Sequence, residues 1–421
     1  MLTSTSASPL RILVAPDSFK GSLTAAEAAA AIAAGLDDAL GASARIRRMP
    51  IADGGEGTLD VLIDAAGATE LTAIAADALG RPRRCRFAML PSGAALIEAA
   101  EANGLPHVED QPLQPLAASS FGVGVLVRAA LESGADEILL TVGGSASTDG
   151  GAGLLHALGA RLLDAHGDEI SDGGGALRSL AAIDLTGLMP RARAVRWRIA
   201  CDVDNPLTGP TGAAAVFGPQ KGATDADVDA LDVALGQLAS VLRDATGVEV
   251  RHFAGGGAAG GIPATLHAVF DAELSPGIDL VAEALDLDGA IAESDLVVTG
   301  EGSFDGQSLR GKGPGAIAAL ARANGVPVVV IAGSVSLTSE QLAQTGIMMA
   351  LPLADGATTL DELLRRAPQL LRATASRLGG LIKLGIGGAQ RASESADALD
   401  TDPRPALAAL TTPRTIKGEG S

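Results

Sequence analysis

Several residue types are scarce or absent in this chain of 421 residues, and each scarcity excludes a class of protein. There is no tyrosine, and the two cysteines, Cys85 and Cys201, are too few for a disulfide framework or a thiolate zinc site, which favours a reducing cytoplasm. No apolar run is long enough to cross a membrane, and the first ten residues lack the segments of a signal peptide. We therefore expect a cytoplasmic protein with no membrane partner.

Positive charge is also scarce. The net charge of −19 leaves no broad basic face, so nucleic acid is not an expected partner. The five histidines all lie outside the glycine-rich loops described below. A histidine base or a histidine-ligated metal is therefore not expected.

Lysine is rarer than arginine: the chain has five lysines and 26 arginines. Three of the five, Lys20, Lys221 and Lys312, are each followed by glycine in a loop. Lysine is a compact cation that suits a phosphate or carboxylate group, and glycine lets backbone N–H groups approach the same anion. We interpret the three as candidate anion-binding residues, and a solvated surface charge is the alternative for any one of them.

Apolar, β-branched runs alternate along the chain with acidic, glycine-rich loops and alanine-rich helical stretches. The runs fall at residues 11–16, 46–52, 137–142, 197–200, 295–299 and 327–332. After the first run, Thr24 and Glu27 form a capping-box pattern that predicts a helix to about Ala34. The alternation predicts an α/β protein with mostly parallel sheets, in which ligands bind beyond the carboxyl ends of the strands.

The length and the hydrophobic content of 47% predict two α/β domains. Residues 11–85 together with 280–384 are expected to form a Rossmann-like domain. Residues 86–279 are expected to form a second domain inserted in the first, with the active site in the cleft between them. Residues 1–10 are predicted to be a disordered lead and residues 385–421, which hold few large apolar side chains, a mobile tail.

Carboxylates follow several of the predicted strands. They are Asp17, Asp53 with Glu56, Asp149, Asp202 with Asp204, and Glu301 with Asp305. One or two carboxylates together with phosphate oxygens can hold Mg²⁺, and a carboxylate can also accept the proton of a hydroxyl group. For any single one of them, a turn or helix-cap role is the alternative.

The loop GGSASTDGGAG at residues 143–153 is the strongest candidate for an anion-binding loop, because it follows a predicted strand and opens a helix. Its candidate nucleotide-binding residues, taken with Lys221, are Gly143, Gly144, Ser145, Ser147, Thr148, Gly150 and Gly151. No Walker motif is present. The stretch GGGAAG at residues 255–260 matches the dinucleotide pattern GxGxxG only formally, because it does not follow a clear strand; close backbone packing or a hinge is the alternative.

From these residues we infer a phosphoryl-transfer or phosphate-binding enzyme that uses Mg²⁺. Six long strings also carry a family resemblance. They are APDSFKGSLTAAEAA (15–29), PIADGGEGTLDVL (50–62), GGSASTDGGAG (143–153), ACDVDNPLTGPTGAAAVFGPQKGAT (200–224), GGGAAGGIPA (255–264) and VVTGEGSFDGQSLRGKGPGAIA (297–318). In content and order they resemble the bacterial glycerate kinases of the type I, two-domain class over about residues 11–380.

The resemblance implies phosphorylation of D-glycerate with ATP and Mg²⁺ by an enzyme of glyoxylate or sugar-acid catabolism. The expected product is 2-phosphoglycerate in preference to 3-phosphoglycerate. The resemblance also implies a cleft between two α/β domains. We expect a monomer or a homodimer.

The roles of single residues are inferred from their chemistry. ATP phosphates are expected over residues 143–153 and near Lys221 and Lys312. Asp202 is the first candidate for the base, with Lys20 and Lys312 as catalytic cations. The candidate substrate-binding residues are Asp17, Ser18, Lys20 and Arg310, and the candidate Mg²⁺ ligands are Asp53, Asp202 and Asp204.

Two other functions remain open at this point. A nicotinamide-dependent sugar-acid reductase would use the GxGxxG stretch, and binding of a reduced nicotinamide would identify it. A non-catalytic protein that binds phosphorylated sugar acids would bind its ligand tightly without turning over ATP.

Overall fold

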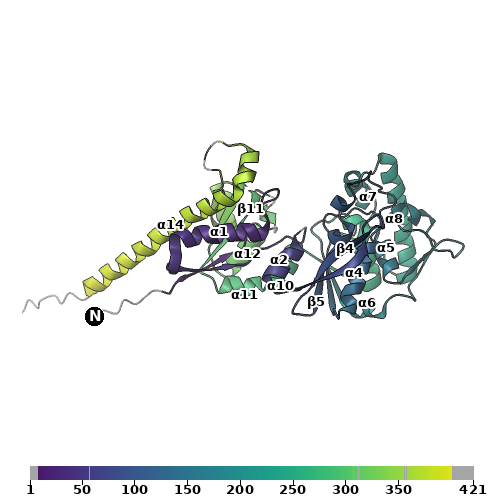
Figure 1. Ribbon diagram of the computed structural model, residues 1–421, viewed down its shortest axis with the longest axis horizontal. Coiled ribbons are helices and arrows are strands. Elements are labelled where there is room, and N and C mark those ends of the chain that lie inside the picture. The colour runs from purple at the N-terminus through teal and green to yellow at the C-terminus, as the bar shows by residue number, and fades with distance from the viewer. Residues whose placement is uncertain are drawn as a thin grey trace, which may run out of the picture.

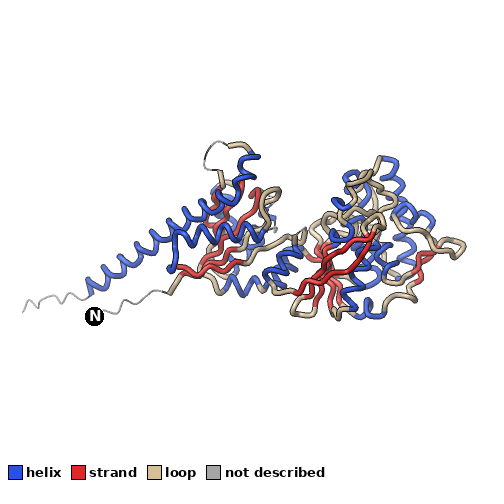
Figure 2. Tube along the Cα trace, in the orientation of Figure 1, coloured by secondary structure: helices blue, strands red, loops and turns tan. Residues whose placement is uncertain are grey.

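The computed structural model describes residues 8–55, 57–306, 308–310, 313–354, 356 and 358–400, with side chains to residue 386 except that of residue 310. The chain folds around two main sheets (Figures 1 and 2). The smaller has the order β13-β12-β11-β1-β2, and all of its neighbours are parallel. Its strands are β1 (Leu10–Val14), β2 (Ala44–Arg48), β11 (Leu296–Phe304), β12 (Val328–Val335) and β13 (Ile347–Pro352).

The larger sheet has the order β10-β9-β6-β5-β4-β3. Its strands are β3 (Thr69–Ala76), β4 (Pro82–Met89), β5 (Ala94–Glu98), β6 (Glu137–Thr141), β9 (Arg196–Ala200) and β10 (Glu273–Ser275). The strands β5, β6, β9 and β10 are parallel, whereas β4 is antiparallel to both of its neighbours. A separate short pair joins β7 (Arg161–Leu163) to β8 (Ala182–Asp184).

The mixed α/β class with mostly parallel sheets is therefore confirmed, and each of the six predicted apolar runs overlaps a strand. The chain leaves the smaller sheet after β2, builds the larger sheet and returns with β11. The strands β3 and β4 pair within the larger sheet. We propose a domain division that follows the sheets, which places the first boundary before Thr69 rather than at Cys85.

Helices cover both faces of the smaller sheet. Successive residues of a strand point to opposite faces, so they pack against different helices. Ile12 and Val14 lie in an apolar cluster with α1 (Ala25–Leu40) and α14 (Leu360–Asp400). Leu13, between them, lies in a second cluster with α11 (Leu287–Ala292) and α12 (Pro314–Ala323). The short α13 (Ser339–Thr345) precedes β13.

The largest apolar cluster belongs to the larger sheet. The helices around this sheet are α3 (Ala99–Asn103), α4 (Phe121–Glu132), α5 (Ala152–Ala157), α6 (Pro190–Ala194), α7 (Ala213–Phe217), α8 (Asp225–Thr246) and α9 (Ile262–Phe270). The 3-10 turns are η1 (Gly41–Ser43), η2 (Leu105–His107), η3 (Gly174–Ser179), η4 (Pro219–Lys221), η5 (Ala258–Gly261) and η6 (Ser308–Arg310).

Two short helices, α2 (Thr58–Ala65) and α10 (Gly277–Leu285), lie between the sheets (Figure 1). Leu59 and Leu62 of α2 share one buried cluster with Leu13 of the smaller sheet and with Leu96 and Leu139 of the larger one. This cluster makes the apolar core continuous from one sheet to the other.

The predicted capping box is present at the start of α1. The Thr24 N–H donates to Glu27 Oε2 at 2.9 Å and the Glu27 N–H to Thr24 Oγ1 at 3.2 Å. The helix runs on to Leu40, past the predicted end at Ala34. Likewise α14 continues through Gly385 to Asp400, so this part of the expected mobile tail is helical. Residues 1–7 of the predicted lead and residues 401–421 of the tail lie outside the described residues.

Candidate active site

A cavity of about 220 Å³ lies where loops from the two sheets meet. Residues 53–55, which follow β2 of the smaller sheet, line one part of it. Residues 142–145 after β6 and 200–203 after β9 line it from the larger sheet. Because each of these segments follows the carboxyl end of a strand, the cavity occupies the place where parallel sheets bind ligands.

Gly277 ties the Asp53 loop to the Asp202 loop. The Gly277 N–H donates to Asp202 Oδ1 at 3.0 Å, and the Gly277 backbone lies directly against the backbone of Asp53. Asp53 Oδ1 in turn accepts the Gly55 N–H at 3.0 Å. Both Asp53 and Asp202 line the cavity, so carboxylates from two different sheets face the same space.

Lys221 lies at the wall of the same cavity, and its side chain is only 2% exposed. Its Nζ donates to Ser145 Oγ at 3.1 Å and to the carbonyl oxygen of Ser147 at 2.5 Å. Burial lowers the pKa of Lys221 to about 8, against a smaller opposing effect of Asp149. A buried ammonium with two neutral oxygen partners has no counter-ion in direct contact, so an anionic ligand in the cavity would stabilise it.

The loop at residues 143–153 divides into two parts. Gly143, Gly144 and Ser145 line the cavity. The side chains of Ser147 and Thr148, which the sequence suggested as nucleotide-binding residues, are fully buried and do not line the cavity.

The buried part of this loop holds the protein interior together. Ser147 Oγ accepts from Asn103 Nδ2 at 2.8 Å. Asp149 accepts from the N–H and hydroxyl groups of Ser120 at 2.7 and 2.8 Å, and from the N–H groups of Gly151 and Gly153 at 3.2 Å. Asp149 therefore joins the N-termini of α4 and α5, which is a helix-cap role.

The glycines at residues 150–151 and 255–261 allow close packing of backbone on backbone. A side chain at Gly257 would collide with the carbonyl oxygen of Pro206, and one at Gly261 would meet Gly150. Gly150 and Gly151 adopt φ values of 64° and 79°, in the left-handed region that favours glycine. The GxGxxG match is therefore explained by packing, and neither Gly150 nor Gly151 lines the cavity.

A second group of acidic residues lies at the carboxyl ends of β1 and β11. Burial raises the pKa of Asp17 to about 6, helped by the charge of Asp53, whereas Ser18 and Lys20 act against the shift. Burial likewise raises the pKa of Glu301 to about 7, and Asp17 adds to this shift. Lys20 is exposed beside this group. In both groups burial is the largest cause of the raised pKa, and neighbouring carboxylates add to it.

Among the described residues, four further predicted site residues do not line the cavity: Asp17, Ser18, Lys20 and Asp204. Asp204 is exposed and does not line it, although Asp202 does. Lys312 and the side chain of Arg310 lie outside the described residues. Glu56 also lies outside them.

The donors at the cavity suit a hard cation that a ligand shares. No group of three or more histidine, cysteine or acidic side chains among the described residues could hold a metal ion unaided. Asp53 and Asp202 supply carboxylate oxygens at the cavity wall. Mg²⁺ is commonly held by one or two carboxylates together with substrate phosphates and water, so this pair fits it.

Sequence reasoning missed several residues of the cavity wall. Phe217 and Gln220 reach it from α7 and η4, and Ala258 and Ala259 from η5. All four fall within the strings that carried the family resemblance, but their side chains have no chemistry that would single them out. Ala259 has a φ of 48°, which is unusual for alanine and places the η5 backbone at the cavity.

The chain is similar to known proteins over most of its length. The model of the Glycerate kinase family matches residues 12–383. The chain is 45% identical to glycerate kinase of Bacillus subtilis (strain 168), covering 89% of this chain and 98% of that protein. It is 42% identical to glycerate 2-kinase of Escherichia coli (strain K12), covering 90% and 99% of the two chains.

A crystal structure from Salmonella typhimurium LT2, described as a glycerate kinase 2, has a TM-score of 0.81 to this structure. The two chains are 41% identical, and the match covers 90% of this chain and 100% of the other. Within the residues that the structure describes, none of the helices combines the length and apolar character needed to cross a membrane.

Proposed function

Because the chain belongs to the glycerate kinase family, we propose that it transfers the γ-phosphoryl group of ATP to D-glycerate and forms 2-phosphoglycerate. The observation that carries this proposal is the buried Lys221 in a cavity that also holds a glycine-rich loop and two carboxylates. A cation, backbone donors and metal-binding oxygens in one enclosed space are what phosphoryl transfer requires. The 42% identity to a glycerate 2-kinase supports 2-phosphoglycerate in preference to 3-phosphoglycerate.

The nucleotide phosphates are assigned to Lys221 and to residues 143–145. Lys221 is fixed by Ser145 and by the Ser147 carbonyl oxygen, so its charge is held in place before a ligand arrives. Preorganised charge of this kind stabilises negative charge that develops in a transition state. Lys312 is assigned as a further catalytic cation on its sequence context alone.

Asp53 and Asp202 are the residues that would hold Mg²⁺, and Asp204 is left out because it does not line the cavity. The ion would neutralise phosphate charge when bound. Asp202 is also the first candidate for the group that accepts the proton of the attacking hydroxyl. Transfer forms the bond from that oxygen to the γ-phosphorus and breaks the bond to the ADP oxygen, while the proton moves to the carboxylate.

Glycerate is assigned to the smaller sheet, at Asp17, Ser18, Lys20 and Arg310. Lys20 would bind the substrate carboxylate, and Asp17 would accept a hydrogen bond from a hydroxyl group of glycerate. Replacement of Lys20 by methionine should therefore raise the KM for glycerate at least as much as it lowers kcat.

Neither alternative function gains support from a specific observation. The glycines of the GxGxxG segment are packed against backbone, as at Gly257 and Pro206, so the match is explained without a dinucleotide. A protein that only binds phosphorylated sugar acids would fail the turnover test below. We further propose a cytoplasmic enzyme, monomeric or homodimeric, in which Cys85 and Cys201 form no disulfide.

The test is the release of ADP from ATP in a coupled assay over a panel of C3 to C6 sugar acids, with and without Mg²⁺. We expect turnover only when D-glycerate and Mg²⁺ are both present. The position of transfer is read from the product by phosphorus NMR, where a phosphate on C2 couples to one proton and a phosphate on C3 to two. Turnover with glycerol or glucose and none with glycerate would refute the substrate.

The carboxylate roles are separated by Asp53→Asn and Asp202→Asn. Asp53→Asn removes only a Mg²⁺ ligand and should be partly rescued by more Mg²⁺. Asp202→Asn also removes the proposed base, so it should lower kcat by about 10²–10⁴-fold, and more Mg²⁺ should not restore this loss. Equal rescue of both variants would contradict the division.

A further inference from the structure

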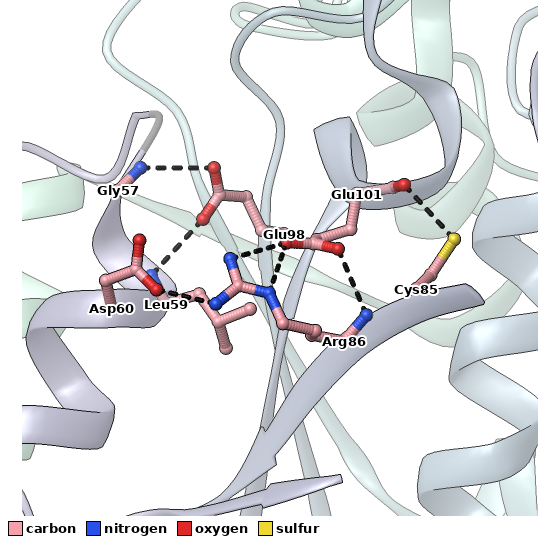
Figure 3. Close-up of polar contacts among 7 residues, drawn as sticks. All are labelled: Gly57, Leu59, Asp60, Cys85, Arg86, Glu98 and Glu101. Carbon is pink, nitrogen blue, oxygen red and sulfur yellow. Dashed lines mark hydrogen bonds and ion pairs between the residues drawn. The ribbon is translucent and has the colours of Figure 1, made fainter. Parts of the chain in front are cut away.

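A buried glutamate outside the cavity contacts the segment that carries Asp53. Glu98 is the last residue of β5, and its side chain is 6% exposed. Oε1 accepts the Gly57 N–H and Oε2 accepts the Leu59 N–H, each at 3.2 Å (Figure 3). Both donors lie at the N-terminus of α2, two to four residues beyond the cavity-lining segment 53–55.

The helix α2 has no cap of its own. Its N-cap residue is Gly57, with a φ of 89° and no side chain. The first N–H groups of a helix need acceptors from elsewhere, and an Asp, Asn, Ser or Thr at the N-cap usually provides one. Here Glu98 provides two, from a strand of the larger sheet that lies 41 residues along the chain.

A series of hydrogen bonds leads from this cap to Asp53. Thr58, which lies between the two donors and is fully buried, donates its hydroxyl to the Gly55 carbonyl oxygen at 2.7 Å. The Gly55 N–H donates to Asp53 Oδ1 at 3.0 Å. Glu98 thus fixes the backbone on both sides of Thr58, and the Thr58 hydroxyl group fixes Gly55. The Gly55 N–H in turn orients the Asp53 carboxylate by a hydrogen bond to Oδ1.

Glu98 also lies beside the strand that carries the anion loop. It pairs with Thr141, the last residue of β6, and the cavity-lining residues 142–145 follow directly. Glu98 therefore connects the start of α2, through its side chain, to the strand before residues 142–145, through its backbone pairing, although the Asp53 segment and residues 142–145 follow strands of different sheets.

The charged side chains around Glu98, namely Arg86, Glu101 and Asp60, bond one another and not the α2 N–H groups (Figure 3). Arg86 of β4 donates from Nε and from its backbone N–H to the Glu101 carboxylate, and its Nη1 donates to Asp60 Oδ1 at 2.7 Å. These contacts join α2 and α3 to β4. Burial raises the pKa of Glu98 to about 7, with Glu101 and Asp60 adding to the shift and the two N–H donors opposing it.

We propose that Glu98 is a positioning residue of the active site, which acts through the α2 N-terminus to hold Asp53 in the orientation that binds the metal–nucleotide complex. This rests on the role proposed above for Asp53. Partners of this kind, one step removed from a metal ligand, commonly affect metal affinity or activity by about 10–100-fold when lost.

The test uses Glu98→Gln in the full-length protein, which keeps the size of the side chain but can accept only one of the two N–H groups. We expect the Mg²⁺ concentration for half-maximal rate to rise about 10-fold or more. Binding of Mn²⁺ in the presence of a non-hydrolysable ATP analogue, followed by electron paramagnetic resonance, should weaken by a similar factor.

Glu101→Gln is the matched control, because it removes a neighbouring carboxylate that bonds Arg86 and does not bond the α2 N-terminus. Its Mg²⁺ and Mn²⁺ dependence should match the unchanged protein, whatever its melting temperature. Thr58→Val breaks the middle of the series and should reproduce the metal defect. It also serves as the test variant if Glu98→Gln does not fold.

A double-mutant cycle with Asp53→Asn distinguishes positioning from a general structural role. If Glu98 acts through Asp53, Glu98→Gln should weaken Mn²⁺ binding by less than about threefold in the Asp53→Asn background. Equal losses in both backgrounds, or a Glu98→Gln variant with the metal dependence of the control, would overturn the inference and leave the Asp53 assignment intact. An Asp53→Asn variant with unchanged metal dependence would overturn both.

Discussion

Gly277, at the start of α10, lies so close to Asp53 that a Cβ atom on Gly277 would collide with the Asp53 carbonyl oxygen. The same glycine donates its N–H to Asp202. One residue without a side chain therefore sets the spacing between the two carboxylates proposed to hold Mg²⁺. Gly277 does not have a φ in the left-handed region, so glycine is required here by the lack of space for a side chain and not by the backbone angle.

Replacement of Gly277 by alanine should lower kcat/KM by about 10–100-fold, because the Asp53 segment must move away from Asp202 and small displacements of catalytic groups are costly. The measurement is steady-state kinetics with Mg²⁺ varied. Gly380→Ala on α14 is the matched control, since nothing lies within 4 Å of its added carbon. Normal kinetics in Gly277→Ala would show that the loop spacing does not matter for catalysis.

The loops at the strand ends could be predicted because their signals are local. Apolar runs followed by glycine and acidic residues marked the segments at Asp53, Gly143 and Asp202, and all three line the cavity. Which loop side chains face outward could not be predicted, since it depends on partners distant in sequence. Ser147 is turned inward by Asn103, 44 residues earlier.

Burial of charged side chains was equally hidden from the sequence. Lys221 lies in a glycine-bearing turn that resembles an exposed loop, yet it is buried in the fold, where it bonds Ser145. Because Ser145 is 76 residues away in the sequence, the local pattern could not show this contact. Glu98 ends a run of apolar residues and is followed by alanines, so its sequence context suggested no role. Its function becomes apparent only when α2 is placed against the end of β5.

Lys221→Met should lower kcat/KM for ATP by about 10²-fold, the usual scale for the loss of one fixed contact to developing charge. The variant should also change how stability depends on pH. Because the pKa of Lys221 falls from 10.5 to about 8 on folding, the unfolded chain binds more protons between these values, and the free energy of unfolding rises with pH across this window.

This rise should be smaller in Lys221→Met than in the unchanged protein. The comparison is between chemical denaturation at pH 7.5 and at pH 9.5 for both proteins. Subtraction of the two proteins removes the contribution of every other titrating group. Identical pH dependence would mean that Lys221 is solvated and charged in solution.

Asp17→Asn should stabilise the protein at neutral pH while impairing glycerate binding. The pKa of Asp17 is raised from 3.8 to about 6 in the folded protein, so the folded state binds more protons between these values and stability falls as pH rises through them. The neutral asparagine avoids this loss, which is about 1–3 kcal/mol at pH 7.5. The measurement pairs chemical denaturation at pH 4.5 and 7.5 with the KM for glycerate.

Asp37→Asn is the control for this experiment, because Asp37 is an exposed aspartate on α1. It should change neither the stability difference between the two pH values nor the KM. If the free energy of unfolding of Asp17→Asn equals that of Asp37→Asn at both pH values, the raised pKa of Asp17 is contradicted.

Deletion of residues 390–421 should leave kcat and KM unchanged, because the family match ends at residue 383 and, among the described side chains of α14, the last buried hydrophobic one is Leu378. Lys383 still donates to the Ala39 carbonyl oxygen at 3.1 Å, so the shortened helix keeps its contact with the end of α1. Deletion from residue 370 onward removes Leu371, Ala375 and Leu378 from the core cluster beneath α1.

The longer deletion should lower the melting temperature by about 10 °C or more, because several buried apolar side chains are lost together. The two deletions thus separate the part of α14 that closes the core from the part that extends beyond it. The measurements are thermal melts and steady-state kinetics of both proteins. A tenfold loss of kcat/KM in the shorter deletion, about 1.4 kcal/mol of transition-state stabilisation, would show that the end of the chain reaches the active site.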